Sequence, residues 1–169
     1  MTHLSMLIHG LDIRPASIDD VSIILDCIKA LADYEKLTHE VIATEEALRT
    51  TLFGERPAAE VVIGYTENGI PAGFAIFFSN YSTFLAKPGI YLEDLFVKPE
   101  FRGKGFGKAM LIYLARIAQE RGCGRLEWSV LDWNTPAIDF YQSLGATPMD
   151  EWTVFRLTGA TLEQLASQS

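Results

Sequence analysis

The sequence predicts an α/β fold in which a mixed, mostly antiparallel twisted sheet is flanked by helices. The apolar residues follow helical spacing near the N-terminus, then β-rich runs, then alternating strands and helices. The 169 residues are 49% hydrophobic and 21% charged, which suits a globular domain with a substantial core. No repeat or Pro/Ser-rich linker divides the chain. We therefore expect a loose tail over residues 1–10 and a single domain over residues 11–169.

The first half of the chain predicts one strand, two helices and a hairpin. Ser17 and Asp20 have the spacing of a capping box, and Thr44 precedes two glutamates at the start of the second helix. Glu67-Asn68-Gly69 is a strong hairpin signal between two β-rich runs. In order, we expect a strand over 11–14, helices over 21–32 and 44–53, strands over 61–65 and 73–78, and a loop over 79–89.

The second half predicts strands that alternate with helices. Pro99 stops the next strand, and Gly122 ends the helix that follows it. Thr135 is the expected N-cap of a later helix, with Pro136 at the first helical position. We expect a strand over 90–97, a helix over 105–120, a strand over 125–131, a helix over 136–144, a strand over 153–157 and a short helix over 161–166. The predicted order is β-α-α-β-β-β-α-β-α-β.

Charge and cysteine content exclude several functional classes. The net charge of −8 disfavours nucleic-acid binding, because the chain would repel phosphate. No apolar run approaches the roughly 20 residues that a membrane span needs. Cys27 and Cys123 have no Cys or His at metal spacing, so we expect no metal site. Without a signal-peptide pattern, we expect both thiols to be reduced in the cytoplasm.

A turn rich in glycine and cations is the most informative segment. It follows the strand over 90–97 and opens the helix over 105–120, where unpaired N–H groups and the helix dipole attract phosphate. A Walker loop does not fit, because Ala109 follows Gly107-Lys108. The dinucleotide fingerprint needs a glycine where Lys108 stands. The pattern that fits is Arg102-x-x-Gly105-x-Gly107, the diphosphate loop of one enzyme superfamily.

The chain resembles the GNAT superfamily of N-acetyltransferases and, within it, the diamine (spermidine/spermine) acetyltransferase branch. The similarity extends from Ile13 to Leu165. Besides the glycine turn, it is carried by Ile13-Arg14-Pro15-Ala16, Tyr34-Glu35, Gly54-Glu55-Arg56-Pro57, Tyr91-Leu92-Glu93-Asp94, Trp133-Asn134-Thr135-Pro136, Phe140-Tyr141, Gly145-Ala146 and Arg156-Leu157. The resemblance implies a GNAT-like fold, acetyl-CoA as cosubstrate and a homodimer.

The resemblance also implies a set of site residues. Acetyl-CoA would be bound by Leu95, Phe96, Val97, Arg102, Gly103, Lys104, Gly105, Phe106, Gly107, Lys108, Asn134, Thr135, Pro136, Ala137 and Tyr141. The amine would be bound by Tyr34, Glu35, Glu93, Glu127, Trp128 and Ser129.

Catalysis needs a base for the ammonium, a donor for the oxyanion and an acid for the departing thiolate. Adjacent strand residues face opposite sides, so only one of Glu93 and Asp94 should face the site. The resemblance favours Glu93 as base and Tyr141 as acid. The N–H groups of Leu95 to Val97 would serve the oxyanion if the strand splays there.

Departures from the family pattern leave the acceptor open. The acidic and aromatic residues that the family carries before Tyr91 fall here among Ser82, Thr83, Phe84 and Leu85, and its C-terminal acid aligns with Thr153. Fewer carboxylates would bind a long polyamine less tightly, so a smaller amine or a lysine-like amino acid remains a candidate acceptor. Two alternatives remain: acetylation of a protein or peptide amine, and a non-catalytic acyl-CoA-binding module.

Overall fold

The computed structural model describes residues 5–168, which divide after Ser129 into two compact units. The first unit consists of β1 (Met6–Ile8), β2 (Leu11–Pro15), α1 (Val21–Tyr34), α2 (Glu45–Phe53), β3 (Glu60–Tyr65), β4 (Pro71–Ser82), β5 (Lys87–Val97), α3 (Phe106–Glu120) and β6 (Leu126–Trp128). The second unit holds α4 (Thr135–Ser143) and α5 (Gly159–Ala166). Short 3-10 turns cover Ile18–Asp20, Thr38–Glu40 and Pro99–Phe101.

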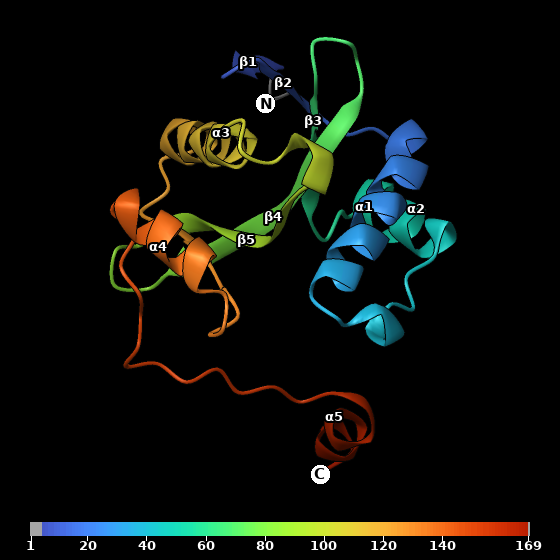
Figure 1. Ribbon diagram of the computed structural model, residues 1–169. Helices are drawn as coiled ribbons and strands as arrows, with labels where there is room; N and C mark the ends of the chain where they lie inside the picture. Colours follow the sequence, from blue (N-terminus) through green and yellow to red (C-terminus); the bar gives the residue numbers. More distant parts are fainter. Residues whose placement is uncertain (1–4, 169) are drawn as a thin grey trace. The chain divides into compact units, whose positions relative to one another are not determined.

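The six strands form one sheet in the order β1-β2-β3-β4-β5-β6. Neighbouring strands are antiparallel, except that β5 and β6 are parallel. A parallel pair needs a crossover, which α3 supplies between these two strands. Figure 1 shows α1 and α2 on one face of the sheet and α3 on the other. The predicted fold class, a mixed and mostly antiparallel sheet flanked by helices, is confirmed.

The hydrophobic core follows from the two periodicities of the sequence. Leu48 and Leu52 lie one helical turn apart on α2, while Val61 and Ile63 alternate on β3. They pack with further buried side chains from α1, β4 and β5, namely Val21, Ile24, Cys27, Phe74 and Phe96. On its inner side, α3 buries Ala109, Met110, Tyr113, Leu114 and Ile117. Each large apolar side chain buried in this way contributes about 1.5–3 kcal/mol to folding.

Several predicted local signals are present. Ser17 and Asp20 form the capping box, and the Thr44 hydroxyl accepts a hydrogen bond from the Ala47 N–H at 3.1 Å. Thr66 N–H donates to the Ile70 carbonyl at 2.9 Å across the predicted hairpin turn. The local chemistry of these residues therefore fixes the 3-10 turn before α1, the start of α2 and the turn between β3 and β4.

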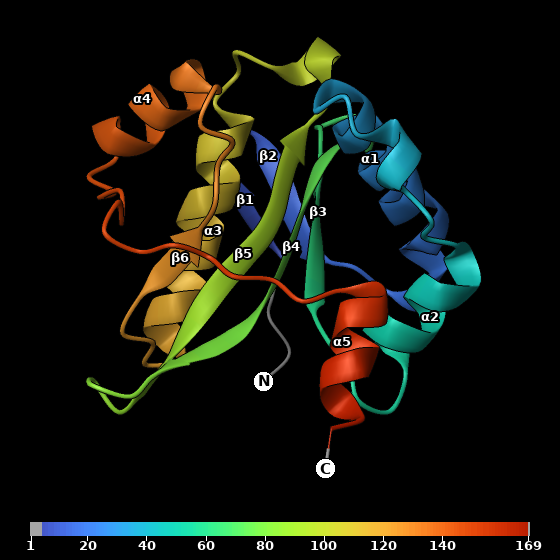
Figure 2. The same ribbon diagram turned by 90° about the horizontal axis from the view of Figure 1, so that it is seen from below.

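Two expectations for the first unit are wrong. The tail predicted over residues 1–10 contains strand β1, in which Met6 pairs with Ile13 and Ile8 with Leu11. Residues 1–4 of that tail lie outside the described residues. The loop predicted over 79–89 is mostly strand, because β4 and β5 continue their pairing to Ser82 and Lys87. The long hairpin that results is visible in Figure 2.

Three expectations near the C-terminus are also corrected. The strand predicted over 125–131 is only the three residues of β6. Residues 153–157 form no strand, and Phe155 is 92% exposed. The N-cap of α4 is Asn134 rather than Thr135, because the Asn134 side chain accepts from the Ala137 N–H at 3.4 Å. A run of β-favouring residues alone thus does not make a strand when no partner strand pairs with it.

Candidate active site

The glycine turn joins β5 to α3 through a backbone that favours glycine. Gly103 and Gly105 have φ of +76° and +79°, and Gly105 is the N-cap of α3. L-residues avoid this left-handed region. A Cβ added at either glycine would meet no atom within 4 Å, so the turn leaves open space on its outer side. The first N–H groups of α3 have no side-chain cap. The turn therefore presents uncapped donors to an open space, which fits a diphosphate.

Arg102 connects this turn to the C-terminal end of α1. Its Nε donates to the Val97 carbonyl at 3.0 Å. Its guanidinium carbon lies 4.5 Å from the centre of the Tyr34 ring and 5.5 Å from that of Phe96. Such cation–π contacts are worth about 0.5–1 kcal/mol each at exposed positions. The structure thus brings a predicted coenzyme residue and a predicted acceptor residue into direct contact.

A β-bulge interrupts β5 at the acidic pair. Ile76 of β4 pairs with Asp94 and Phe77 with Leu92, so Glu93 is the extra residue. Simple alternation therefore does not decide between Glu93 and Asp94, contrary to the sequence argument. Glu93 is exposed, whereas Asp94 is half-buried. Burial raises the pKa of the Asp94 carboxyl to about 6, and the nearby carboxylates of Glu93 and Glu35 add to the rise.

The edge of β5 that faces β6 is only partly paired. β6 pairs with Ile90, Tyr91 and Leu92, and among residues 5–168 no strand continues that pairing along residues 93–97. On the other side, β4 pairs with β5 as far as Val97. In an antiparallel pair, alternate N–H groups point away from the partner strand. The stretch from Leu95 to Val97 therefore offers N–H groups at a free sheet edge, as the splayed strand expected from the sequence would.

The predicted acceptor residues separate into two groups. Tyr34 and Glu35 lie at the end of α1, where burial raises the pKa of the Glu35 carboxyl. A hollow of about 310 Å³ beside Glu35 is lined by Ile28, Leu31, Ala32, Leu37, Glu40, Val41, Ile42 and Ala43. By contrast, Glu127 on β6 is ion-paired with Arg125 at 2.7 Å and accepts from Asn80 at 3.0 Å. The carboxylate of Glu127 is thus held by other protein groups.

The remaining predicted residues are on β6 and α4. Ser129, at the end of the first unit, shares a 2.6 Å hydrogen bond with the Tyr91 hydroxyl, and Trp128 pairs with Leu92 across the sheet. Thr135, Pro136 and Ala137 form the first turn of α4, behind the cap Asn134. Tyr141 lies on the same helix, with its ring centre 5.6 Å from that of Phe140.

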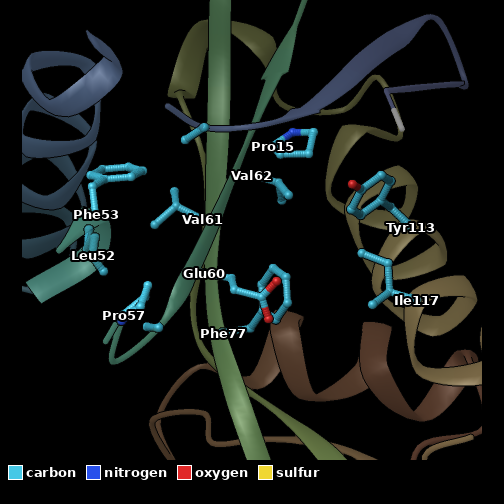
Figure 3. Close-up of a pocket in the computed structure, with 12 residues that line it drawn as sticks. Pro15, Leu52, Phe53, Pro57, Glu60, Val61, Val62, Phe77, Tyr113 and Ile117 are labelled. Carbon is cyan, nitrogen blue, oxygen red and sulfur yellow. The ribbon is translucent and has the colours of Figure 1, made fainter. Parts of the chain in front are cut away.

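A second pocket of about 210 Å³ lies at the Glu60 end of β3 (Figure 3). Figure 3 shows Tyr113 and Ile117 of α3 on one side and Leu52 and Phe53 of α2 on the other. None of the predicted site residues lines it. It is therefore separate from the glycine turn and from the acidic pair.

The bulge at Glu93 is the feature of the site that the sequence does not reveal. The resemblance favours Glu93, with the expectation that side chains alternate regularly along this strand. No sequence signal marks the bulge, because a bulge arises from pairing with β4 and not from the local residue pattern.

Comparison with known proteins identifies the class of enzyme. The family model of the acetyltransferase (GNAT) family matches residues 28–146. The chain therefore belongs to the GNAT family, and it is an acetyltransferase.

Individual relatives match over nearly their full length. The chain is 40% identical to the thialysine N-epsilon-acetyltransferase of Bos taurus, over 92% of this chain and 97% of that protein. It is 36% identical to the L-ornithine N5-acetyltransferase NATA1 of Arabidopsis thaliana, over 90% and 86%. Among solved structures, the integron cassette protein VCH_CASS6 from V. cholerae is similar with a TM-score of 0.77 and 28% identity, over 94% of this chain and 99% of that one. Within residues 5–168, no helix has the length and apolar character needed to cross a membrane.

Proposed function

We propose that the protein transfers the acetyl group of acetyl-CoA to a primary amine of a small molecule. The observation that carries this proposal is the glycine turn, where uncapped N–H groups of α3 border an open space at Gly103 and Gly105. The turn would hold the diphosphate through Gly103 to Lys108, with Arg102 beside it, and Asn134 to Ala137 and Tyr141 would contribute from α4. Bound acetyl-CoA supplies the acetyl group as a reactive thioester.

The proposed roles of the chain's own residues follow from the chemistry of amine acetylation. An alkylammonium has a pKa near 10.4 and must lose a proton before it attacks. A carboxylate at the bulge of β5 would accept that proton, and the resemblance assigns this role to Glu93, directly or through a water. The free N–H groups between Leu95 and Val97 would stabilise the oxyanion. The Tyr141 hydroxyl would donate a proton to the departing sulfur.

A small cationic acceptor is supported by the charge near the end of α1. Glu35 and Glu93 both act electrostatically on Asp94. The adjoining hollow combines apolar side chains with the carboxylates of Glu35 and Glu40. The relatives named for thialysine and ornithine act on amino acids with a side-chain amine. We propose an acceptor of this size, a diamine or a lysine-like amino acid, bound by Tyr34, Glu35 and Glu93, with Trp128, Ser129 and Glu127 contributing from β6.

The test is a coenzyme A release assay across short diamines, ornithine, thialysine, spermidine and a lysine peptide. We expect turnover with the small amines and little with the peptide. Turnover with the peptide alone would favour the protein-acetylating alternative. If no amine in the panel led to coenzyme A release but acetyl-CoA bound tightly, the non-catalytic acyl-CoA-binding module would be favoured.

We further propose that both units act as one cytoplasmic acetyltransferase domain that forms a homodimer. The family match crosses the boundary at Ser129, and both cysteines are free thiols, which suits a reducing compartment. Trp152, Val154 and Phe155 are 76%, 82% and 92% exposed, which supports a partner surface there. Light scattering should give twice the monomer mass, and replacement of Trp152 and Phe155 by serine should reduce it. A monomer at micromolar concentration would contradict the dimer.

A further inference from the structure

The bulge in β5 places its two acidic side chains in different surroundings. Leu95 and Val97 lie on the face of the sheet that α3 covers, since a Cβ at Gly107 would meet them at 3.9 and 4.0 Å. Phe96 belongs to the core against α1 and α2. Asp94, two residues before Phe96, therefore lies on the α1 face, where it is half-buried. Glu93, the extra residue of the bulge, is exposed.

The charges around Asp94 are acidic. Glu93 acts on it from its own strand and Glu35 from the end of α1. Its partner across the strand pair is the apolar Ile76. Arg102 stacks on Tyr34, the neighbour of Glu35, and this contact holds the end of α1 against β5. Asp94 thus lies near two negative groups and is partly shielded from water.

These surroundings make Asp94 a stronger base than an ordinary aspartate. Burial first, and the two carboxylates second, raise its pKa from 3.8 to about 6. A rise of about two pKa units corresponds to about a hundredfold higher proton affinity, and the group still ionises at neutral pH. A general base works best when its pKa lies near the operating pH, because it is then both ionised and basic.

We infer that Asp94 is the residue that accepts the proton of the amine, while Glu93 holds the ammonium at the mouth of the bulge. The inference rests on the proposed function and assigns its proton acceptor. One N–H bond of the ammonium breaks, an O–H bond forms on Asp94, and the nitrogen keeps the electron pair. That pair forms the new amide bond as the thioester C–S bond breaks. The nitrogen loses a second proton as the amide forms, and the departing sulfur gains one, so these two protons balance. Asp94 then releases its proton to solvent.

The test compares pH profiles of kcat/KM for the wild type, Asp94→Asn and Glu93→Gln at saturating acetyl-CoA. Asp94→Asn should lower kcat by about 10²–10⁴-fold and remove the fall in activity below about pH 6. Glu93→Gln should mainly raise KM for the amine and keep that fall, shifted to lower pH because a neighbouring charge is gone. Asp33→Asn, an exposed position on α1, is the matched control and should leave the profile unchanged.

A measurement without substrate covers the case in which Asp94→Asn folds poorly. NMR titration of the carboxyl carbons in the wild type should show Asp94 titrating near pH 6, and lower in Glu35→Gln. Titration of Asp94 near pH 4, its ordinary range, would overturn the inference. The inference would also be overturned if Glu93→Gln lost the fall in kcat/KM at low pH while Asp94→Asn kept it. That outcome would leave the proposed function intact. A wild type inactive toward every amine would instead overturn the proposed function, and the inference with it.

Discussion

The glycine turn can be tested by separating its effect on folding from its effect on binding. Gly105 and Gly122 stand just outside the two ends of α3, both with positive φ, and a Cβ at either would meet no atom within 4 Å. Alanine at each position therefore costs only the left-handed strain, about 1–2 kcal/mol. Because a chain of this size loses about 2–4 °C of Tm per kcal/mol, both variants should melt lower by a similar amount.

Only Gly105→Ala should weaken acetyl-CoA binding. Its methyl group would enter the open space beside the uncapped N–H groups, where the diphosphate is proposed to lie. We expect at least about a tenfold rise in Kd by calorimetry, equivalent to about 1.4 kcal/mol. Gly122→Ala, with the same backbone strain at the opposite end of the helix, should bind normally. If both variants lose stability equally and both bind with wild-type affinity, the turn is only a structural one.

Three further predictions concern single side chains. Arg102→Lys keeps the charge but loses the planar stack on Tyr34, so KM for the amine should rise by about two- to fivefold; an unchanged KM would argue against that contact. Tyr141→Phe should lower kcat by at least about 10²-fold with little change in the Kd of acetyl-CoA, and unchanged turnover would remove Tyr141 from the acid role. Burial raises the pKa of the Cys27 thiol to about 11, so Cys27 should react with a thiol reagent only after unfolding, whereas the less buried Cys123 should react in the native protein. Equal native rates for the two thiols would contradict the buried position of Cys27.

The elements predicted most accurately were those defined by local chemistry. The capping box at Ser17 and the Asn68-Gly69 turn require only residues within a few positions of one another. The first strand was missed because Met6–Ile8 is three residues long and depends on pairing with β2. Its one local signal was the turn at His9 and Gly10, which both adopt positive φ.

The strand expected over 153–157 does not form, because the pairing that makes β1 a strand is missing there. Thr153, Val154 and Phe155 are residue types that favour strands, yet no strand pairs with them in the part of the chain that the structure describes. Similarly, the site could be predicted only in part. The motif of the glycine turn indicated the phosphate site, but the stack of Arg102 on Tyr34 and the bulge at Glu93 depend on contacts between distant segments. The sequence offers no pattern from which those contacts follow.

The most direct test of the account is calorimetric titration of the wild-type protein with acetyl-CoA. We expect saturable binding of one molecule per chain, with affinity that falls in Gly105→Ala. The absence of any binding heat, together with an unchanged Tm at saturating acetyl-CoA, would contradict it, because a ligand that binds the native state must stabilise it.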